Sequence, residues 1–282
     1  MKDIKIPESW GLGLTELEKI YQVEVEQANK LRNASALKRK QLYSTVYEEY
    51  FRLLPFHPQF TIKRNEILKQ SRVDYQLRQI LPFIQNKKSF VEIGAGDCSL
   101  SIAASKYCSK VYALEVSNNI ADNLEFPSNV KLVLFDGFNF PFEANTLDAA
   151  YSNQLMEHLH SEDAEEQLKN IFRILKPDGI YICITPNRIS GPHDISRFFT
   201  DKPVGFHLRE YSATDLQNIF LKSGFKKVIA YTILKGKKVE LPFWLVKLIE
   251  RMAETLNTAH RKSFLNFRPV SIIFNAVIAA VK

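Results

Sequence analysis

From Phe90 onward, short apolar runs alternate with segments of helical periodicity, and this alternation constrains the fold more than any other feature of the chain. Strands joined by helical crossovers are typical of a parallel, doubly wound sheet. The sequence therefore predicts an α/β fold for residues 86–282, with one sheet of seven strands. The apolar runs place these strands at residues 90–94, 111–116, 131–135, 148–152, 179–185, about 226–233 and 271–281.

The first 85 residues have a helical pattern without strand-like apolar runs. Residues 15–54 contain neither Pro nor Gly, and apolar residues such as Leu42 and Val46 recur there at helical spacing. A second helical stretch follows at residues 63–80. We therefore expect residues 1–85 to form a helical cap on the sheet domain.

A long insert, residues 241–268, separates the last two predicted strands. Within it, Leu245, Ile249 and Met252 follow helical spacing, which favours packing in a core or lid. Basic residues flank this stripe, so peripheral contact with a membrane surface stays open as an alternative.

Charge and hydropathy indicate which partners and which cellular location to expect. The net charge is +7, with basic ends and an acidic middle. We attribute this asymmetry to solvated lysines on helix faces, and the alternative is an anionic partner such as a nucleic acid, a membrane surface or a phosphorylated substrate. No uncharged stretch reaches the length of a membrane-spanning helix, and the first residues lack the apolar run of a signal peptide. We expect a cytoplasmic protein.

Cysteine usage excludes two kinds of site. Cys98, Cys108 and Cys183 are widely spaced and form neither a disulfide framework nor a zinc-binding pattern. We expect them to be small buried residues, and we expect no metal centre.

The stretch VEIGAGDC follows the first predicted strand and contains Gly94 and Gly96, with Ser99 where a dinucleotide fingerprint has its third glycine. Two acids follow in order, because Glu115 ends the second predicted strand and Asp136 follows the third. Acids at these strand ends are placed to accept hydrogen bonds from ribose hydroxyls and from an adenine amino group. The incomplete glycine series disfavours a nicotinamide-dependent oxidoreductase.

Five motifs in this order, VEIGAGDC, ALEVS, LFDG, DAAYSNQLMEHL and RILKPDGIYICITPN, resemble a class I S-adenosylmethionine-dependent methyltransferase. The resemblance covers residues 89–230. It implies a Rossmann-like, doubly wound, seven-stranded sheet whose last strand is antiparallel, with S-adenosyl-L-methionine as the cofactor. The cap and the loop around TPNRISGPHD also resemble a methyltransferase type 11-like bacterial subgroup, for which the resemblance implies no substrate.

The resemblance implies a cofactor site at the strand ends. Glu115 would bind the ribose hydroxyls, and Asp136 with Gly137 would bind the adenine edge. The glycine turn would approach the amino-acid portion and the ribose, with Asn153 beside the methionine portion. The full set of candidate cofactor residues is Glu92, Gly94, Ala95, Gly96, Glu115, Val116, Asp136, Gly137 and Asn153.

Candidate catalytic residues lie in two loops that would face the methyl group. His158 follows the fourth strand, and His193 and His207 lie in the long polar segment after the fifth. An imidazole has an unperturbed pKa suited to proton transfer near neutrality. For His158 we favour a structural role, packing against the following helix, whereas for His193 beside Asp194 both interpretations stay open.

Substrate-binding candidates share the second loop. Guanidinium groups match carboxylate or phosphate, so two arginines are candidates for an anionic group on the acceptor. The candidates are Asp194, Arg197, Arg209 and Tyr211, with Tyr43, Tyr47, Phe51 and His57 as lining from the cap.

These features favour methylation, on oxygen or nitrogen, of a small molecule such as a sugar, a lipid precursor or a secondary metabolite. The alternatives are a nucleic-acid methyltransferase, an NAD-dependent oxidoreductase and a catalytically silent cofactor-binding module. The nucleic-acid alternative is disfavoured because SNQL stands where amino-methylating members carry a tetrapeptide such as NPPY.

Overall fold

One sheet of eight strands, in the order β3-β2-β1-β4-β5-β8-β6-β7, forms the centre of the computed structural model, which describes residues 5–58, 66–116 and 125–282. Neighbouring strands among β1 to β5 pair in parallel, and β8 is antiparallel to both β5 and β6. The strands are β1 Lys87–Ile93, β2 Cys108–Glu115, β3 Val130–Leu134, β4 Leu147–Asn153, β5 Leu175–Ile184, β6 Lys227–Leu234, β7 Lys237–Leu241 and β8 Val277–Val281.

The doubly wound sheet and its antiparallel last strand are confirmed, but the predicted count of seven strands is wrong. The additional strand is β7, which pairs with β6 across a turn at Gly236. Its sequence, KKVEL, is largely exposed at the sheet edge, so it lacks the apolar run from which the other strands were predicted. The last strand is also shorter than predicted, because residues 268–274 form a helix instead.

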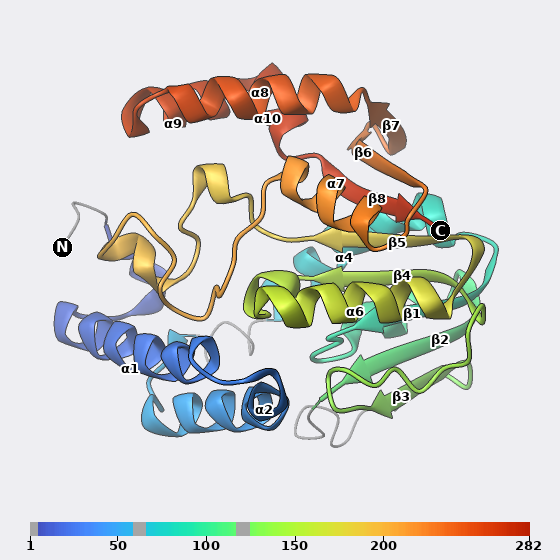
Figure 1. Ribbon diagram of the computed structural model, residues 1–282, viewed down its shortest axis with the longest axis horizontal. Helices are drawn as coiled ribbons and strands as arrows, with labels where there is room; N and C mark the ends of the chain where they lie inside the picture. The colour runs from blue at the N-terminus through green and yellow to red at the C-terminus, as the bar shows by residue number, and fades with distance from the viewer. Residues whose placement is uncertain (1–4, 59–65, 117–124) are drawn as a thin grey trace.

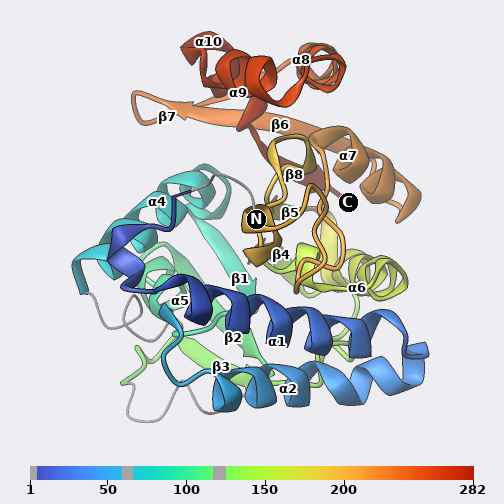
Figure 2. The ribbon, with the colours of Figure 1, turned by 90° about the vertical axis from the view of Figure 1, so that its left-hand side faces the viewer.

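Helices cover both faces of the sheet. In Figure 1, α6 and α7 lie in front of the strands, and Figure 2 shows α4 and α5 on the opposite side. Each face buries its own apolar cluster, one with α6 and α7 and the other with α4 and α5. These covering helices are α4 Glu66–Ile84, which precedes β1, and the crossover helices α5 Ser99–Ala104, α6 Ser161–Ile174 and α7 Ala213–Lys222.

Two antiparallel helices, α1 (Leu14–Arg32) and α2 (Ala36–Leu53), form most of the cap. The stretch of helical character at residues 15–54 forms two helices, which divide before Ser35, whose hydroxyl accepts a hydrogen bond from the Lys38 amide at 3.4 Å and so begins α2. The predicted start of the next helix, at residues 63–65, lies outside the described residues. Figure 1 shows the cap on the side that the carboxyl ends of the parallel strands face.

A buried ion pair fastens the cap to the sheet domain. The Arg39 guanidinium donates to both carboxylate oxygens of Asp163 in α6, at 2.6 and 2.9 Å, and both side chains are almost fully buried. The Tyr43 hydroxyl donates to the same carboxylate at 2.8 Å and accepts a hydrogen bond from the His160 amide at 2.9 Å. Tyr43, a predicted lining residue, therefore acts as an anchor of α2.

The predicted insert, residues 241–268, starts at the last residue of β7 and contains the helices α8 Phe243–Thr255 and α9 Thr258–Asn266. A third helix, α10 Arg268–Phe274, starts at its last residue. Ile249 and Ala253 of α8 are buried among these helices, but Met252 is 46% exposed, so the predicted packing stripe is rotated. Figure 2 shows this helical layer over β6. None of the described helices combines the length and apolar character needed to cross a bilayer.

The three cysteines are free and buried, as predicted.

Replacing Arg39 with Ala tests the anchor of the cap. Because Asp163 would remain buried without its partner, we expect Arg39→Ala to lower the free energy of unfolding by about 3–5 kcal/mol. Lys40→Ala, which breaks a half-exposed pair with Glu166, should cost about 1 kcal/mol or less. Urea denaturation measures both, and equal losses in the two variants would contradict the anchoring role.

Candidate functional site

The glycine turn lies between the end of β1 and the start of α5. The amides of Gly94 and Ala95 donate to the Leu114 carbonyl of β2 at 2.9 and 3.0 Å, which fixes the turn against the neighbouring strand. Gly94 and Gly96 have φ angles of +73° and +54°, a conformation that favours glycine. A Cβ built on Gly96 meets no other atom within 4 Å, so open space lies beside this backbone.

Glu115 joins the end of β2 to this turn. One carboxylate oxygen accepts from the Gly96 amide at 2.8 Å, and the other accepts from the Val116 amide at 2.8 Å. Each oxygen retains a further lone pair, so the half-buried carboxylate can also accept from two ligand hydroxyls. Val116 is 45% exposed and lies 3.6 Å from the position of a Cβ on Gly137. These residues form one continuous surface at the strand ends.

Asp136 and Asn153 complete this edge. Asp136 accepts from the amides of Phe138 and Asn139 at 2.9 and 2.6 Å, which holds the turn through Gly137. Asn153 ends β4, next to the glycine turn, because Ile93 and Ser152 are paired neighbours in the sheet. The strand order reverses between β1 and β4, and ligands of doubly wound sheets bind at such a switch point.

Glu92 occupies a different position from the other candidate cofactor residues. Its side chain is buried behind the turn and accepts a hydrogen bond from the Ser101 hydroxyl of α5 at 2.6 Å. Burial raises the pKa of this carboxyl to about 8. The described contacts of Glu92 therefore support α5 from within the core.

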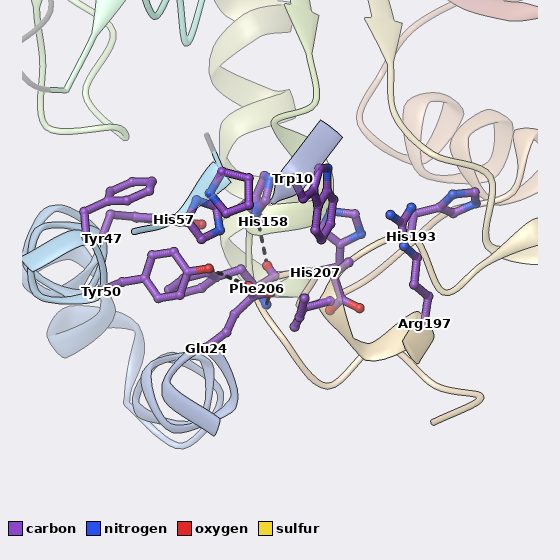
Figure 3. Close-up of a pocket in the computed structure, with 14 residues that line it drawn as sticks. Trp10, Glu24, Tyr47, Tyr50, His57, His158, His193, Arg197, Phe206 and His207 are labelled. Carbon is purple, nitrogen blue, oxygen red and sulfur yellow. Dashed lines mark hydrogen bonds between the residues drawn. The ribbon is translucent and has the colours of Figure 1, made fainter. Parts of the chain in front are cut away.

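A separate cavity of about 380 Å³ lies between the cap and the loops after β4 and β5. Figure 3 shows Tyr47, Tyr50 and His57 of the cap on one side and His193 with Arg197 on the other. Of the predicted lining residues, Tyr47, Phe51 and His57 are present. The loops contribute the predicted residues His158, His193, Asp194, Arg197 and His207.

The cap holds the loop after β5 by its backbone. Arg32 of α1 donates to the carbonyls of Val204 and Gly205 at 2.5 and 2.6 Å, and to that of His207 at 3.2 Å. Glu24, also in α1, accepts from the Phe206 amide at 3.0 Å. We refer to these contacts of Glu24 and Arg32 with residues 204–207 as the loop clamp.

Burial raises the pKa of Glu24 to about 7. Sequence reasoning missed both clamp residues, because charged side chains on a helix give no sign that they are buried.

His158 faces the cavity with a defined tautomer. Its Nδ1 lies 3.2 Å from the Phe206 carbonyl, and since a carbonyl can only accept, Nδ1 carries the proton. The lone pair is therefore on Nε2. Burial, together with neighbouring His207, lowers the pKa of His158 to about 3, so the ring is neutral at physiological pH. The favoured sequence interpretation, packing on the following helix, omitted this contact with the second loop.

His207 lies beside His158, with ring centroids 5.1 Å apart. Its Nδ1 is 2.7 Å from a carboxylate oxygen of Glu210. Burial alone would lower the pKa of His207, but the hydrogen bond to Glu210 and the negative charges of Glu157, Asp194 and Glu210 together outweigh it, and the pKa is raised. Glu210 was not predicted, although its spacing of three residues from His207 is a signal that could have identified it.

His193 and Asp194 are adjacent in sequence but act separately. Nε2 of His193 lies 3.0 Å from the Asn187 carbonyl, so Nε2 carries the proton and Nδ1 has the lone pair. Asp194 accepts from the amides of Ser196 and Gly205 at 3.0 and 2.9 Å. The carboxylate therefore shapes the loop, and the His193 amide donates instead to Glu210 at 2.7 Å.

The two candidate arginines are separated. Arg197 lines the cavity, and its guanidinium carbon lies 5.4 Å from the centre of the Trp10 ring. Arg209 is exposed and lies over the ring of Tyr211, which is itself only 1% exposed and outside the cavity lining. The structure therefore brings Arg197, but neither Arg209 nor Tyr211, into the cavity.

The sequence is similar to that of known methyltransferases. Residues 91–183 match the family described as "Methyltransferase domain". A protein of Mycolicibacterium smegmatis named "Probable S-adenosylmethionine-dependent methyltransferase" is 31% identical over 87 residues, which span 30% of this chain and 31% of that protein. The chain thus matches about a third of this curated relative's length.

A structural neighbour supports the fold. The crystal structure of an S-adenosylmethionine-dependent methyltransferase from Archaeoglobus fulgidus has a TM-score of 0.52 and 16% identity, and it covers 85% of this chain and 100% of its own. The domain match identifies a methyltransferase domain at residues 91–183, and the neighbour shares its doubly wound fold. The names of the curated relative and of the neighbour both give S-adenosylmethionine as the cofactor. The open space beside Gly96 and the carboxylate of Glu115 fit that cofactor.

Two substitutions test the cofactor edge. Glu115→Ala removes a charged hydrogen-bond acceptor, so we expect it to weaken S-adenosylmethionine binding by roughly ten- to a hundredfold. Gly94→Arg places a long side chain at a left-handed position against Leu155 and should weaken binding at least as much. Calorimetric titration measures both, with Glu143→Ala on an exposed site as the control. Unchanged affinity in both variants would place the cofactor elsewhere.

The raised pKa of Glu92 predicts a pH dependence of stability. The folded protein retains this proton up to about pH 8, whereas an ordinary glutamate has a pKa of 4.5. The stabilisation is therefore complete below about pH 4.5 and is lost as the pH rises towards 8. We expect Glu92→Gln to lose less stability than the wild type between pH 5.5 and 8.5 in urea denaturation. Parallel pH profiles for the two proteins would contradict this assignment.

Proposed function

We propose that the whole chain is a methyltransferase that transfers the methyl group of S-adenosylmethionine to a small molecule bound in the cavity under the cap. The observation that carries this proposal is the cavity itself, of about 380 Å³, between the cap and the loops that follow β4 and β5. Small-molecule sites are concave, mostly apolar and supplied with a few polar groups, and this cavity has that character.

The lining favours an acceptor with an anionic group. Arg197 supplies a guanidinium, which recognises carboxylate or phosphate through paired hydrogen bonds. Trp10 lies against this guanidinium, and Tyr50 and Phe51 add aromatic surface from the cap. A phosphorylated or carboxylated sugar, lipid precursor or secondary metabolite would supply the expected anionic group.

Methyl transfer from a sulfonium to an oxygen or nitrogen is a displacement that depends on alignment of the two reacting atoms. When the acceptor is a hydroxyl, the oxygen must lose its proton as the new bond forms, which calls for a base within hydrogen-bond reach. We assign this role to Nδ1 of His193, since the contact of Nε2 with the Asn187 carbonyl fixes the tautomer. Figure 3 shows His193 near Arg197, away from Tyr47 and His57.

Two measurements test the function. Calorimetric titration should show binding of S-adenosylmethionine and none of NAD, and the reverse result would favour an oxidoreductase. Incubation with S-adenosylmethionine and a panel of anionic sugars, phenols and lipid precursors should then release S-adenosylhomocysteine. Cofactor binding without turnover on any acceptor would favour a silent module, and turnover on oligonucleotides alone would favour a nucleic-acid acceptor.

His193→Ala tests the assigned base. We expect kcat for a hydroxyl acceptor to fall by about a hundredfold, with S-adenosylmethionine affinity unchanged, because His193 lies outside the glycine turn. Steady-state kinetics with the acceptor found in the panel measures the first quantity and calorimetry the second. Full activity would remove His193 as a base.

A further inference from the structure

Three side chains that can ligate a metal ion meet at the cavity wall. Glu157 and His158 follow β4, in the 3-10 helix Met156–His158, and His207 comes from the loop after β5. One ligand atom of each lies within 4.8 Å of the other two. Figure 3 shows the imidazoles of His158 and His207 close together.

Both imidazoles have Nε2 available as a ligand atom. Nδ1 of His158 is directed to the Phe206 carbonyl, and Nδ1 of His207 to the Glu210 carboxylate. A histidine that binds a metal usually donates its other ring N–H to a carbonyl or a carboxylate, which fixes the ring and its tautomer. The two histidines here have one partner of each kind.

An independent observation concerns Glu157. Its side chain is fully buried, and one carboxylate oxygen accepts from the Thr185 hydroxyl at 2.8 Å. The other oxygen, Oε1, is buried without a hydrogen-bond partner among the described residues. A buried acceptor without a partner is costly, and a bound cation would satisfy it.

The local charge also favours a cation. The carboxyl groups of Glu157 and Glu210 both lie beside the imidazole pair, and Oε2 of Glu210 is a second buried oxygen without a partner in the described part of the chain. Arg32, the cation of the loop clamp, is directed to backbone carbonyls. Among the described residues, no lysine or arginine forms an ion pair with Glu157 or Glu210, and the ion pair of Glu210 is with the His207 imidazole.

We propose that Glu157, His158 and His207 bind one divalent transition-metal ion, with Zn²⁺ as the first candidate. Two imidazoles and one carboxylate are an established ligand set for Zn²⁺ and for neighbouring transition metals, and less suited to Mg²⁺ or Ca²⁺, which prefer oxygen ligands throughout. Because His158 and His207 line the cavity, the remaining coordination positions face it. Water, or an oxygen atom of the molecule in the cavity, would occupy them.

Metal titration of the full chain tests this proposal. After chelator treatment and dialysis, calorimetry with ZnCl₂ should show one ion per chain, with much weaker binding of MgCl₂. We expect Glu157→Gln, His158→Ala and His207→Ala each to lower the Zn²⁺ affinity by at least about tenfold, because each removes one of three ligands. His193 lines the same cavity without belonging to the cluster. The control variant His193→Ala should therefore retain the wild-type affinity for Zn²⁺.

A second measurement avoids reliance on variants that fold poorly. The zinc-edge X-ray absorption spectrum of the wild-type protein should show two imidazole ligands, whereas a surface site of another composition would not. Absence of stoichiometric binding, binding that survives in Glu157→Gln and His158→Ala, or a spectrum without imidazole ligands would overturn the proposal. Titration of the metal-free protein with S-adenosylmethionine tests the proposed function separately, so either proposal can fail alone.

Discussion

The loop clamp is the interaction on which the rest of the cavity depends. The segment between β5 and α7 contains only short 3-10 turns, so it cannot satisfy its own backbone groups through regular structure. The guanidinium of Arg32 instead donates to three carbonyls of this segment, those of Val204, Gly205 and His207. A buried backbone group without such a partner would cost a substantial part of a hydrogen bond.

The clamp also determines the chemistry of the cavity. Glu24 accepts from the Phe206 amide, and the Phe206 carbonyl fixes the tautomer of His158. The next residue, His207, is held by Glu210. A helix near the start of the chain thereby orients two imidazoles, one after β4 and one after β5. The Arg39–Asp163 pair holds the cap at a second point, on α6, and the cavity lies between the cap and the loops.

Features encoded locally could be predicted from the sequence. The alternation of strands and helices, the glycine turn and the acids at the ends of β2 and β3 all follow from short motifs, and the structure gathers Gly96, Glu115 and Asp136 at one edge of the sheet. The edge strand β7 was missed because an exposed strand carries polar residues, and the division between α1 and α2 depends on one capping serine.

Features that depend on distant contacts could not be predicted in this way. Arg32 and its carbonyl partners are more than 170 residues apart, so no periodicity connects them. The adjacency of His193 and Asp194 in the sequence does not bring their side chains together, because neighbouring side chains in extended backbone point in opposite directions. Asp194 accepts from the amides of Ser196 and Gly205, whereas His193 contacts the Asn187 carbonyl. The cluster of Glu157, His158 and His207 likewise joins two loops that only the folded sheet brings together.

Amide hydrogen exchange on the full chain tests the central claim, that α1 holds the loop after β5, most directly. In Arg32→Ala, the account predicts faster exchange at residues 204–207 than in the wild type, with unchanged exchange in β1 and β4, because the clamp contacts only the loop. Unchanged protection of residues 204–207 in this variant would contradict the account.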